Sequence, residues 1–294
     1  MPLLSSVDFV ESVLAFDEFG EKAHTEEFHW EAAGRQGNVL KAVNEYWTAG
    51  QRQAHSLHEI SYRACFKPQL PSFFVERLTE PGDAVYDPFM GRGTTLLEAW
   101  LLARRPLGND INPLSRVLLE PRINPPEFEA VAQRLDSIDL TSAHEKFEDL
   151  KVFYHPNTLC QIIALKEYLL KREEAGELDQ VDRWIRMVAI NRLTGHSNGF
   201  FSVYSMPPNQ AVSINSQRKI NARREQTPDD RDIVSSILKK SKSLLKDWDG
   251  APLTHEGHML SALLTTEDAG NVAGIEQGVA QLVVTSPPFL DVVN

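Results

Sequence analysis

The chain has 294 residues, of which 42% are hydrophobic and 24% are charged, and its formal net charge is −11 at pH 7. This composition excludes a disordered chain, and no apolar run is long enough to span a membrane. The acidic balance by itself argues against a nucleic-acid partner, because phosphate binding usually leaves a basic footprint.

Cysteine usage and the N-terminus bear on the compartment. The two cysteines, Cys65 and Cys160, are too few for a disulfide framework, which indicates a reducing environment. The N-terminus lacks the basic region and long apolar core of a signal peptide. We therefore expect a cytoplasmic protein.

The N-terminal part of the chain has acidic and aromatic residues at helical spacing. Residues 1–52 are therefore predicted to form a helical segment of one or two amphipathic helices. A further helix is expected over residues 71–78, and Pro81-Gly82 ends it.

The next stretch predicts a strand–loop–helix–strand unit. The strands are expected at 84–86 and 107–110, with a glycine loop at 87–95 and a helix at 96–103 between them. This order is typical of a nucleotide-binding doubly wound sheet, in which Asp110 ends the second strand and can accept both hydroxyls of a ribose. The loop lacks the third glycine of a dinucleotide fingerprint and the lysine of a Walker loop, so it fits a single nucleoside without pyrophosphate.

The second half of the chain is predicted to be helical before it returns to strands. Helices are expected within 127–180, at 181–193 and at 231–248, with a polar loop region over 194–230; strands follow at about 260–265 and at 281–284. The last strand leads into Thr285-Ser286-Pro287-Pro288-Phe289. Two successive prolines impose a rigid, extended backbone whose carbonyls can face outward as acceptors. The hydroxyl of Ser286 adds an acceptor, and the ring of Phe289 offers a stacking surface for a base.

Together, these two segments resemble the amino-methyltransferases of DNA, which use S-adenosylmethionine to methylate N4 of cytosine or N6 of adenine. Residues 87–95 are similar to the family's cofactor loop, 109–113 to the acidic end of its second strand, and 66–70 to the segment that contacts the methionine end of the cofactor. The resemblance covers residues of about 55–120 and 260–294. It implies the cofactor S-adenosylmethionine, bound by Lys67, Asp87, Pro88, Phe89, Gly91, Gly93, Thr94, Asp110 and Asp268.

The same resemblance assigns the catalytic motif. Ser286-Pro287-Pro288-Phe289 matches the family's (D/N/S)-P-P-(Y/F) pattern, and the serine version is most often associated with cytosine N4, which is therefore favoured over adenine N6. Residues 200–209 also place two prolines after an apolar run, but Met206 separates Ser205 from them, so we interpret this segment as a structured loop.

The implied fold class is α/β, a Rossmann-like methyltransferase sheet with a large, mainly helical insertion. The sheet is expected to be incomplete at the C-terminus, because the chain ends soon after the catalytic motif. The expected parts are an N-terminal helical segment, a cofactor-binding part, an insertion with a DNA-contacting region, and the return to the sheet, at residues 1–52, 53–122, 123–257 and 258–294.

The charge is unevenly distributed, and this reverses the first impression of the composition. Residues 183–246 hold twelve Lys and Arg against four acids, a balance of +8, which leaves −19 for the rest of the chain. Such a basic segment in an acidic protein is the footprint of a phosphate-contacting surface. We therefore expect double-stranded DNA as the partner, contacted by Arg218, Lys219, Arg223 and Arg224.

Two alternatives remain open. An RNA guanine-N2 methyltransferase has similar motifs, although an acidic residue usually precedes its two prolines. A catalytically incomplete cofactor- and DNA-binding half would need a second chain or a missing C-terminal half to complete the sheet. Cytosine-C5 methylation is unsupported, because Cys65 and Cys160 do not follow a proline, and no metal site is expected.

Overall fold

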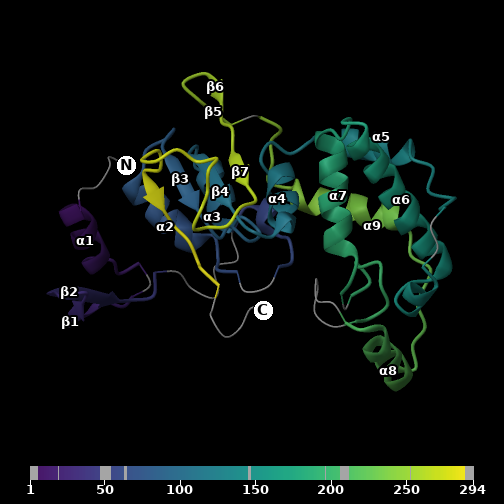
Figure 1. Ribbon diagram of the computed structural model, residues 1–294, viewed down its shortest axis with the longest axis horizontal. Helices are drawn as coiled ribbons and strands as arrows, with labels where there is room; N and C mark the ends of the chain where they lie inside the picture. Colours follow the sequence, from purple (N-terminus) through teal and green to yellow (C-terminus); the bar gives the residue numbers. More distant parts are fainter. Residues whose placement is uncertain are drawn as a thin grey trace.

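The computed structural model describes residues 6–18, 20–46, 54–62, 65–144, 147–195, 197–205, 212–251 and 253–288. Three parts follow one another along its long axis: a β-hairpin, a parallel sheet and a group of helices (Figure 1). Across the described residues, no helix has the length and apolar character needed to cross a bilayer.

The central sheet consists of four parallel strands in the order β7-β4-β3-β8: β3 (Ala84–Asp87), β4 (Arg105–Asn109), β7 (Leu263–Thr265) and β8 (Leu282–Val283). The chain runs outward from β3 through β4 to β7 and then returns to the other side of β3 as β8. This reversal is the switch point of a doubly wound sheet, where ligands bind at the carboxyl ends of the strands. The α/β class with a parallel sheet is as predicted, and β4 begins two residues earlier than the predicted 107.

Two helices pack beside this sheet. They are α2 (Gln69–Leu78) and α3 (Thr94–Leu101), which contact each other, and α3 connects β3 to β4. Val75, Val85 and Ala99 are completely buried between these elements. The apolar residues of each helix recur at helical spacing, which gives it one face to bury.

The helical group lies in the chain between β4 and β7. It contains α4 (Pro113–Leu119), α5 (Phe128–Asp136), α6 (Pro156–Glu174), α7 (Gln180–Arg192), α8 (Ile214–Arg224), α9 (Ile233–Leu244) and the short 3-10 helices η2 (Glu120–Arg122) and η3 (Glu148–Val152). Trp184, Met187 and Val188 of α7 are completely buried, so this is the buried helix predicted at 181–193. The 3-10 helix η1 (Ser56–His58) contributes Leu57 to the same core, which extends from the loop after β3 to α9.

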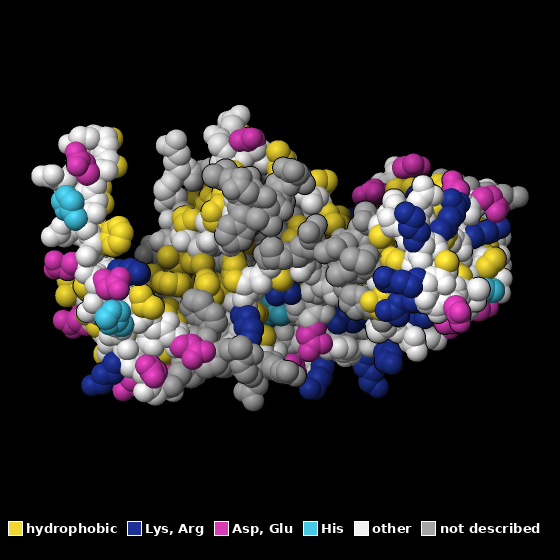
Figure 2. All heavy atoms as spheres, turned by 90° about the horizontal axis from the view of Figure 1, so that it is seen from below, with side chains coloured by type: hydrophobic (Ala, Val, Ile, Leu, Met, Phe, Trp, Pro, Cys, Tyr) yellow, Lys and Arg dark blue, Asp and Glu magenta, His cyan; other side chains and the backbone are white. Residues whose placement is uncertain are grey.

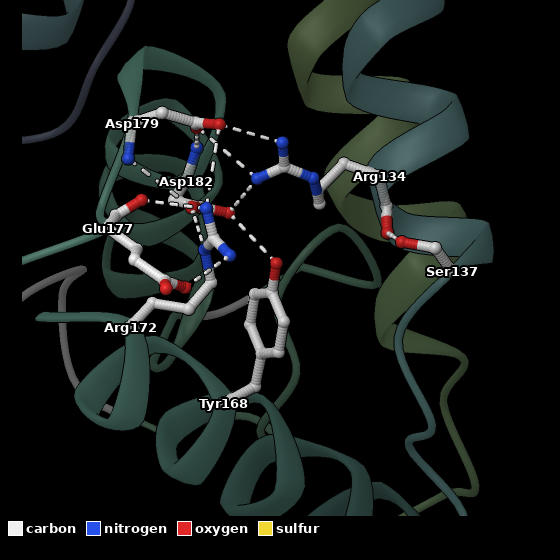
Figure 3. Close-up of polar contacts among 7 residues, drawn as sticks. All are labelled: Arg134, Ser137, Tyr168, Arg172, Glu177, Asp179 and Asp182. Carbon is white, nitrogen blue, oxygen red and sulfur yellow. Dashed lines mark hydrogen bonds and ion pairs between the residues drawn. The ribbon is translucent and has the colours of Figure 1, made fainter. Parts of the chain in front are cut away.

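A buried ionic network joins three of these helices (Figure 3). Asp182 at the start of α7 is completely buried, but its carboxylate accepts hydrogen bonds from Arg134 of α5, from Arg172 of α6 at 2.5 Å and from Tyr168 at 3.2 Å. Asp179 caps α7 and pairs with Arg134 at 2.7 Å. A buried charge is tolerated only when it is paired and hydrogen-bonded in this way, so the network requires one arrangement of the helices.

The N-terminal part differs from the predicted helical segment at 1–52. Among the described residues of this part, α1 (Ser6–Leu14) is the one helix, whereas β1 (His24–Ala32) and β2 (Arg35–Val43) form an antiparallel hairpin. Ala33 and Gly34 connect the strands with φ values of 51° and 74°, the conformation that a two-residue hairpin turn requires. The prediction was wrong because the alternation of Phe28 and Trp30 with polar residues has a period of two, which is typical of a strand.

Several further elements were not expected, and α4, which follows β4, is one of them. Helix α8 lies within the predicted loop region 194–230, and the Ser213 hydroxyl caps it by accepting a hydrogen bond from the Ser216 amide at 3.1 Å. A short hairpin of β5 (Thr254–His255) and β6 (His258–Met259) precedes β7. Helix α8 has few apolar residues, so hydrophobic periodicity gave no signal for it.

Candidate active site

The glycine loop follows β3 and packs closely against its surroundings. Gly91 and Gly93 have φ values of 51° and 79°, a region that side chains rarely adopt. A Cβ at Gly93 would lie 2.6 Å from Leu119, and one at Gly91 would lie 3.4 Å from the ring of Tyr62. The loop therefore passes between α4 and Tyr62, a residue with no role predicted from the sequence.

Asp110 joins the end of β4 to this loop. Its Oδ2 accepts a hydrogen bond from the Gly91 amide at 2.8 Å, and its Oδ1 accepts one from the Asn112 amide at 2.9 Å. A carboxylate has about four acceptor positions, so two such bonds leave capacity for a ligand. Phe89 in the loop and Ile111 after Asp110 expose 37% and 73% of their surfaces.

Asn109 holds the end of β7 against the end of β4. This completely buried side chain donates to the Glu267 carbonyl at 3.0 Å and accepts from the Glu267 amide at 3.0 Å and from the Thr265 hydroxyl at 2.8 Å. Asp268 follows Glu267 in the chain. It is exposed and accepts a hydrogen bond from the Gly270 amide at 2.8 Å. The carboxyl edge of the sheet thus presents Asp110 and Asp268 from adjacent strands.

Asp87 is turned into the protein. The residue is 2% exposed, and its Oδ1 accepts hydrogen bonds from the Phe89 amide at 3.0 Å and from the Thr285 hydroxyl at 2.6 Å. Burial raises the pKa of Asp87 to about 6, against these hydrogen bonds, which lower it. The carboxylate therefore lies between the glycine loop and the segment that leaves β8.

The Ser-Pro-Pro segment begins at this same edge. β8 pairs with β3, and the Val284 amide donates to the Tyr86 carbonyl at 3.1 Å. Ser286, Pro287 and Pro288 are exposed, and Phe289 lies outside the described residues. The start of the glycine loop and the start of the Ser-Pro-Pro segment, almost 200 residues apart in the sequence, are thus side by side.

The remaining predicted cofactor residues lie in or near the loop. Thr94 is buried and its hydroxyl accepts a hydrogen bond from Arg92 at 3.1 Å, while Pro88 is half-buried. Lys67 is half-buried in the turn that precedes α2.

Two arginines without a predicted role, Arg92 and Arg122, hold the loop by hydrogen bonds to backbone carbonyls. Arg92 donates to the His58 and Ile60 carbonyls at 3.2 and 2.9 Å. Arg122 is completely buried and donates to the carbonyls of Leu118, Leu57 and Arg92. Burial lowers the pKa of Arg122 to about 9. Arg92 occupies the position between Gly91 and Gly93 in the predicted loop, and Arg122 belongs to no recognisable pattern, so only the folded chain shows that both fix the loop against η1.

The basic residues predicted to contact DNA lie on α8, at the far end of the helical group. Arg218, Lys219, Arg223 and Arg224 are all exposed. Figure 2 shows Lys and Arg side chains gathered over this end of the molecule. The opposite face of α8 is anchored by polar groups: Gln217 donates to the Tyr204 carbonyl at 2.9 Å, and Asn221 donates to the Val152 carbonyl at 2.8 Å. The side-chain amides of Gln217 and Asn221 thus bind backbone carbonyls of the protein, whereas the four cationic side chains of α8 are exposed.

Comparisons with known proteins find a family model and several curated methyltransferases that are similar to part of this chain. Residues 19–115 match the family model N6_N4_Mtase, described as DNA methylase. The chain is 30% identical over 96 residues to the type II methyltransferase M.MjaII of Methanocaldococcus jannaschii, which is 32% of this chain and 18% of that protein. It is 32% identical over 104 residues to M.BsoBI of Geobacillus stearothermophilus, which is 33% of this chain and 20% of that protein.

A third type II methyltransferase, M.MvaI of Kocuria varians, is 25% identical over 128 residues, or 42% of this chain and 25% of that protein. The chain therefore matches about a quarter or less of the length of these curated relatives, and no solved structure matches it. The family match includes the hairpin, the glycine loop and Asp110. Residues 19–115 of this chain are therefore similar to the family that this model describes as DNA methylase.

Proposed function

We propose that the chain is an S-adenosylmethionine-dependent DNA methyltransferase that methylates the exocyclic amine of a flipped base, with cytosine N4 favoured over adenine N6. One observation carries the proposal: β8 lies beside β3, so the Ser-Pro-Pro segment and the glycine loop share one edge of the sheet. The names of the relatives suggest a place in a type II restriction-modification system. In this proposal, residues 53–122 form the cofactor-binding part, 123–257 are a helical insertion with the DNA-contacting region, and 258–294 return to the sheet and end in the catalytic motif.

The residues at the carboxyl edge fit the proposed cofactor. Asp110 has free acceptor capacity for the ribose hydroxyls, and the exposed side chains of Phe89 and Ile111 provide apolar surface for an adenine ring. Gly91 has no side chain to block a ligand from the loop, and Asp268 is assigned to the adenine amine. When bound, S-adenosylmethionine supplies a methyl group activated by its sulfonium, so that transfer forms one N–C bond, breaks one C–S bond and releases one amine proton to solvent.

The chain's own contribution to the reaction is position. The Ser286 hydroxyl and the Pro287 carbonyl accept the hydrogens of the target amine, which increases electron density on the nitrogen and directs its lone pair. Phe289 is assigned to stack on the flipped base. Because the methyl group needs no further activation, correct orientation supplies most of the rate acceleration.

The basic face of α8 is assigned to the DNA backbone. Four exposed cations on one helix attract phosphates, and Arg224 is held over the ring of Tyr204 at 3.4 Å, which restricts its position. Contacts of this kind position a protein on DNA but do not read sequence.

The direct test is transfer of a tritiated methyl group from S-adenosylmethionine to duplex DNA and, in parallel, to tRNA. We expect incorporation into DNA, and a loss of at least tenfold in Pro287→Ala, because a lost backbone constraint misplaces the acceptor carbonyl. Pro81→Ala, at an exposed turn before β3, is the matched control. Equal incorporation by Pro287→Ala and wild type would contradict the assigned role, and labelling of tRNA alone would favour the RNA guanine-N2 activity.

A further inference from the structure

We propose that Thr285 is a positioning residue: its hydroxyl and the Asp87 carboxylate form a link that holds the Ser286-Pro287-Pro288 segment against the glycine loop. The inference rests on the proposed function, because it concerns the geometry of the same site. It gives Asp87 a different role from the direct cofactor contact that the motif suggests.

Both motifs donate a hydrogen bond to the same oxygen atom of Asp87. Oδ1 of Asp87 accepts a hydrogen bond from the Thr285 hydroxyl at 2.6 Å and another from the Phe89 amide at 3.0 Å. Phe89 belongs to the glycine loop, and Thr285 directly precedes the Ser-Pro-Pro segment. Because Asp87 is 2% exposed, water does not compete freely for this oxygen, and hydrogen bonds to a carboxylate in such a site are strong.

The backbone around Thr285 explains why such a link is needed. β8 is short, and its ends are held by bonds from the Gln281 amide to the Ala84 carbonyl at 2.9 Å and from the Val284 amide to the Tyr86 carbonyl at 3.1 Å. Pro287 and Pro288 have no N–H and cannot extend this ladder. Among the described residues 285–288, Thr285 is the one whose side chain donates a hydrogen bond to β3, where Asp87 accepts it. Thr285 directly precedes the exposed residues 286–288.

The link has a catalytic consequence. A displacement of about 1 Å at a reacting centre can reduce a rate by about 100-fold, because bond formation requires close approach and alignment. Losing the Thr285 hydroxyl is therefore expected to reduce kcat more than it weakens cofactor binding, since Asp110 and the glycine loop keep their own hydrogen bonds.

The first test measures the position of the segment without requiring activity. Hydrogen–deuterium exchange of the full chain is followed in a peptide covering residues 281–286 for wild type, Thr285→Val and Thr285→Ser. We expect Thr285→Val to raise exchange by about tenfold, and Thr285→Ser, which keeps the hydroxyl, to remain near wild type. Thr254→Val, a matched change on the exposed strand β5, should leave this peptide unchanged. Unchanged exchange in Thr285→Val would overturn the proposal.

The second test separates positioning from folding. For methyl transfer to DNA, Thr285→Val should lower kcat by about tenfold with KM for S-adenosylmethionine within about twofold, and Thr285→Ser should recover most of the rate. The double variant Asp87→Asn/Thr285→Val should be no worse than the more impaired single variant, because the two groups act as a pair. An unaltered kcat, or effects that simply multiply, would reject the positioning role. A wild-type chain that transfers no methyl group counts against the proposed function, and exchange alone then decides whether the link exists.

Discussion

The glycine loop and helix α8 use their polar groups in opposite ways. Asp87 and Arg92 of the loop, and Asp110 beside it, form hydrogen bonds with the protein's own backbone. On α8, the amides of Gln217 and Asn221 are used internally, while four cationic side chains remain exposed.

The difference reflects two kinds of chemistry. A transfer reaction needs groups held within fractions of an ångström, which requires their neighbours to be fully hydrogen-bonded and packed. Phosphate binding depends on accessible charge and tolerates mobile side chains, because its attraction is long-ranged. Substitutions should therefore lower the free energy of unfolding most in the loop. Changes of salt concentration should alter the affinity for DNA mainly through α8.

The largest effect is expected from a side chain forced into the loop. Gly93→Ala adds a Cβ that would lie 2.6 Å from Leu119 and keeps a φ of 79°, so we expect a loss of about 3 kcal/mol in the free energy of unfolding. Gly176→Ala is the matched control, because its φ is 71° but nothing lies within 4 Å of the added atom; it should cost about 1 kcal/mol. Urea denaturation measures both, and equal losses would show that the loop is not tightly packed.

A pH-dependent effect is expected from Asp87. Its pKa is raised from 3.8 to about 6 in the folded protein, so the neutral carboxyl stabilises the fold fully below pH 3.8, and this contribution is lost as the pH rises through 6. The stability of wild type relative to Asp87→Asn should therefore fall by up to about 3 kcal/mol over this interval. Urea denaturation at a series of pH values measures the difference, with the exposed Asp136→Asn as background. A flat difference would show that Asp87 is not buried in solution.

The smallest effect is expected at α8, and it concerns affinity rather than stability. Arg223→Gln/Arg224→Gln should weaken binding to duplex DNA by roughly tenfold and reduce the slope of log K against log salt by about 1.8, because two phosphate contacts are lost. Lys22→Gln/Arg35→Gln removes the same charge from exposed sites outside α8. Equal weakening by both pairs would mean that net charge, and not α8, accounts for binding.

Local sequence patterns were sufficient for several elements. The apolar run of β3, the two glycines and the periodic helix α3 are consecutive in the chain, so their arrangement follows from short-range rules. The same is true of the buried helix α7. At the hairpin of β1 and β2, the period of two at Phe28 and Trp30 and the turn at Ala33-Gly34 both indicate strands, and the helical prediction missed them.

By itself, the sequence determined the βαβ unit, the order of the two motifs and the separation of basic from acidic segments, because these depend on residues close together in the chain. Only the tertiary structure decided that Thr285 reaches Asp87, that Arg122 supports the loop and that the cations of α8 face outward. These features join residues from distant elements. They depend on strand order and helix packing, which local periodicity does not encode.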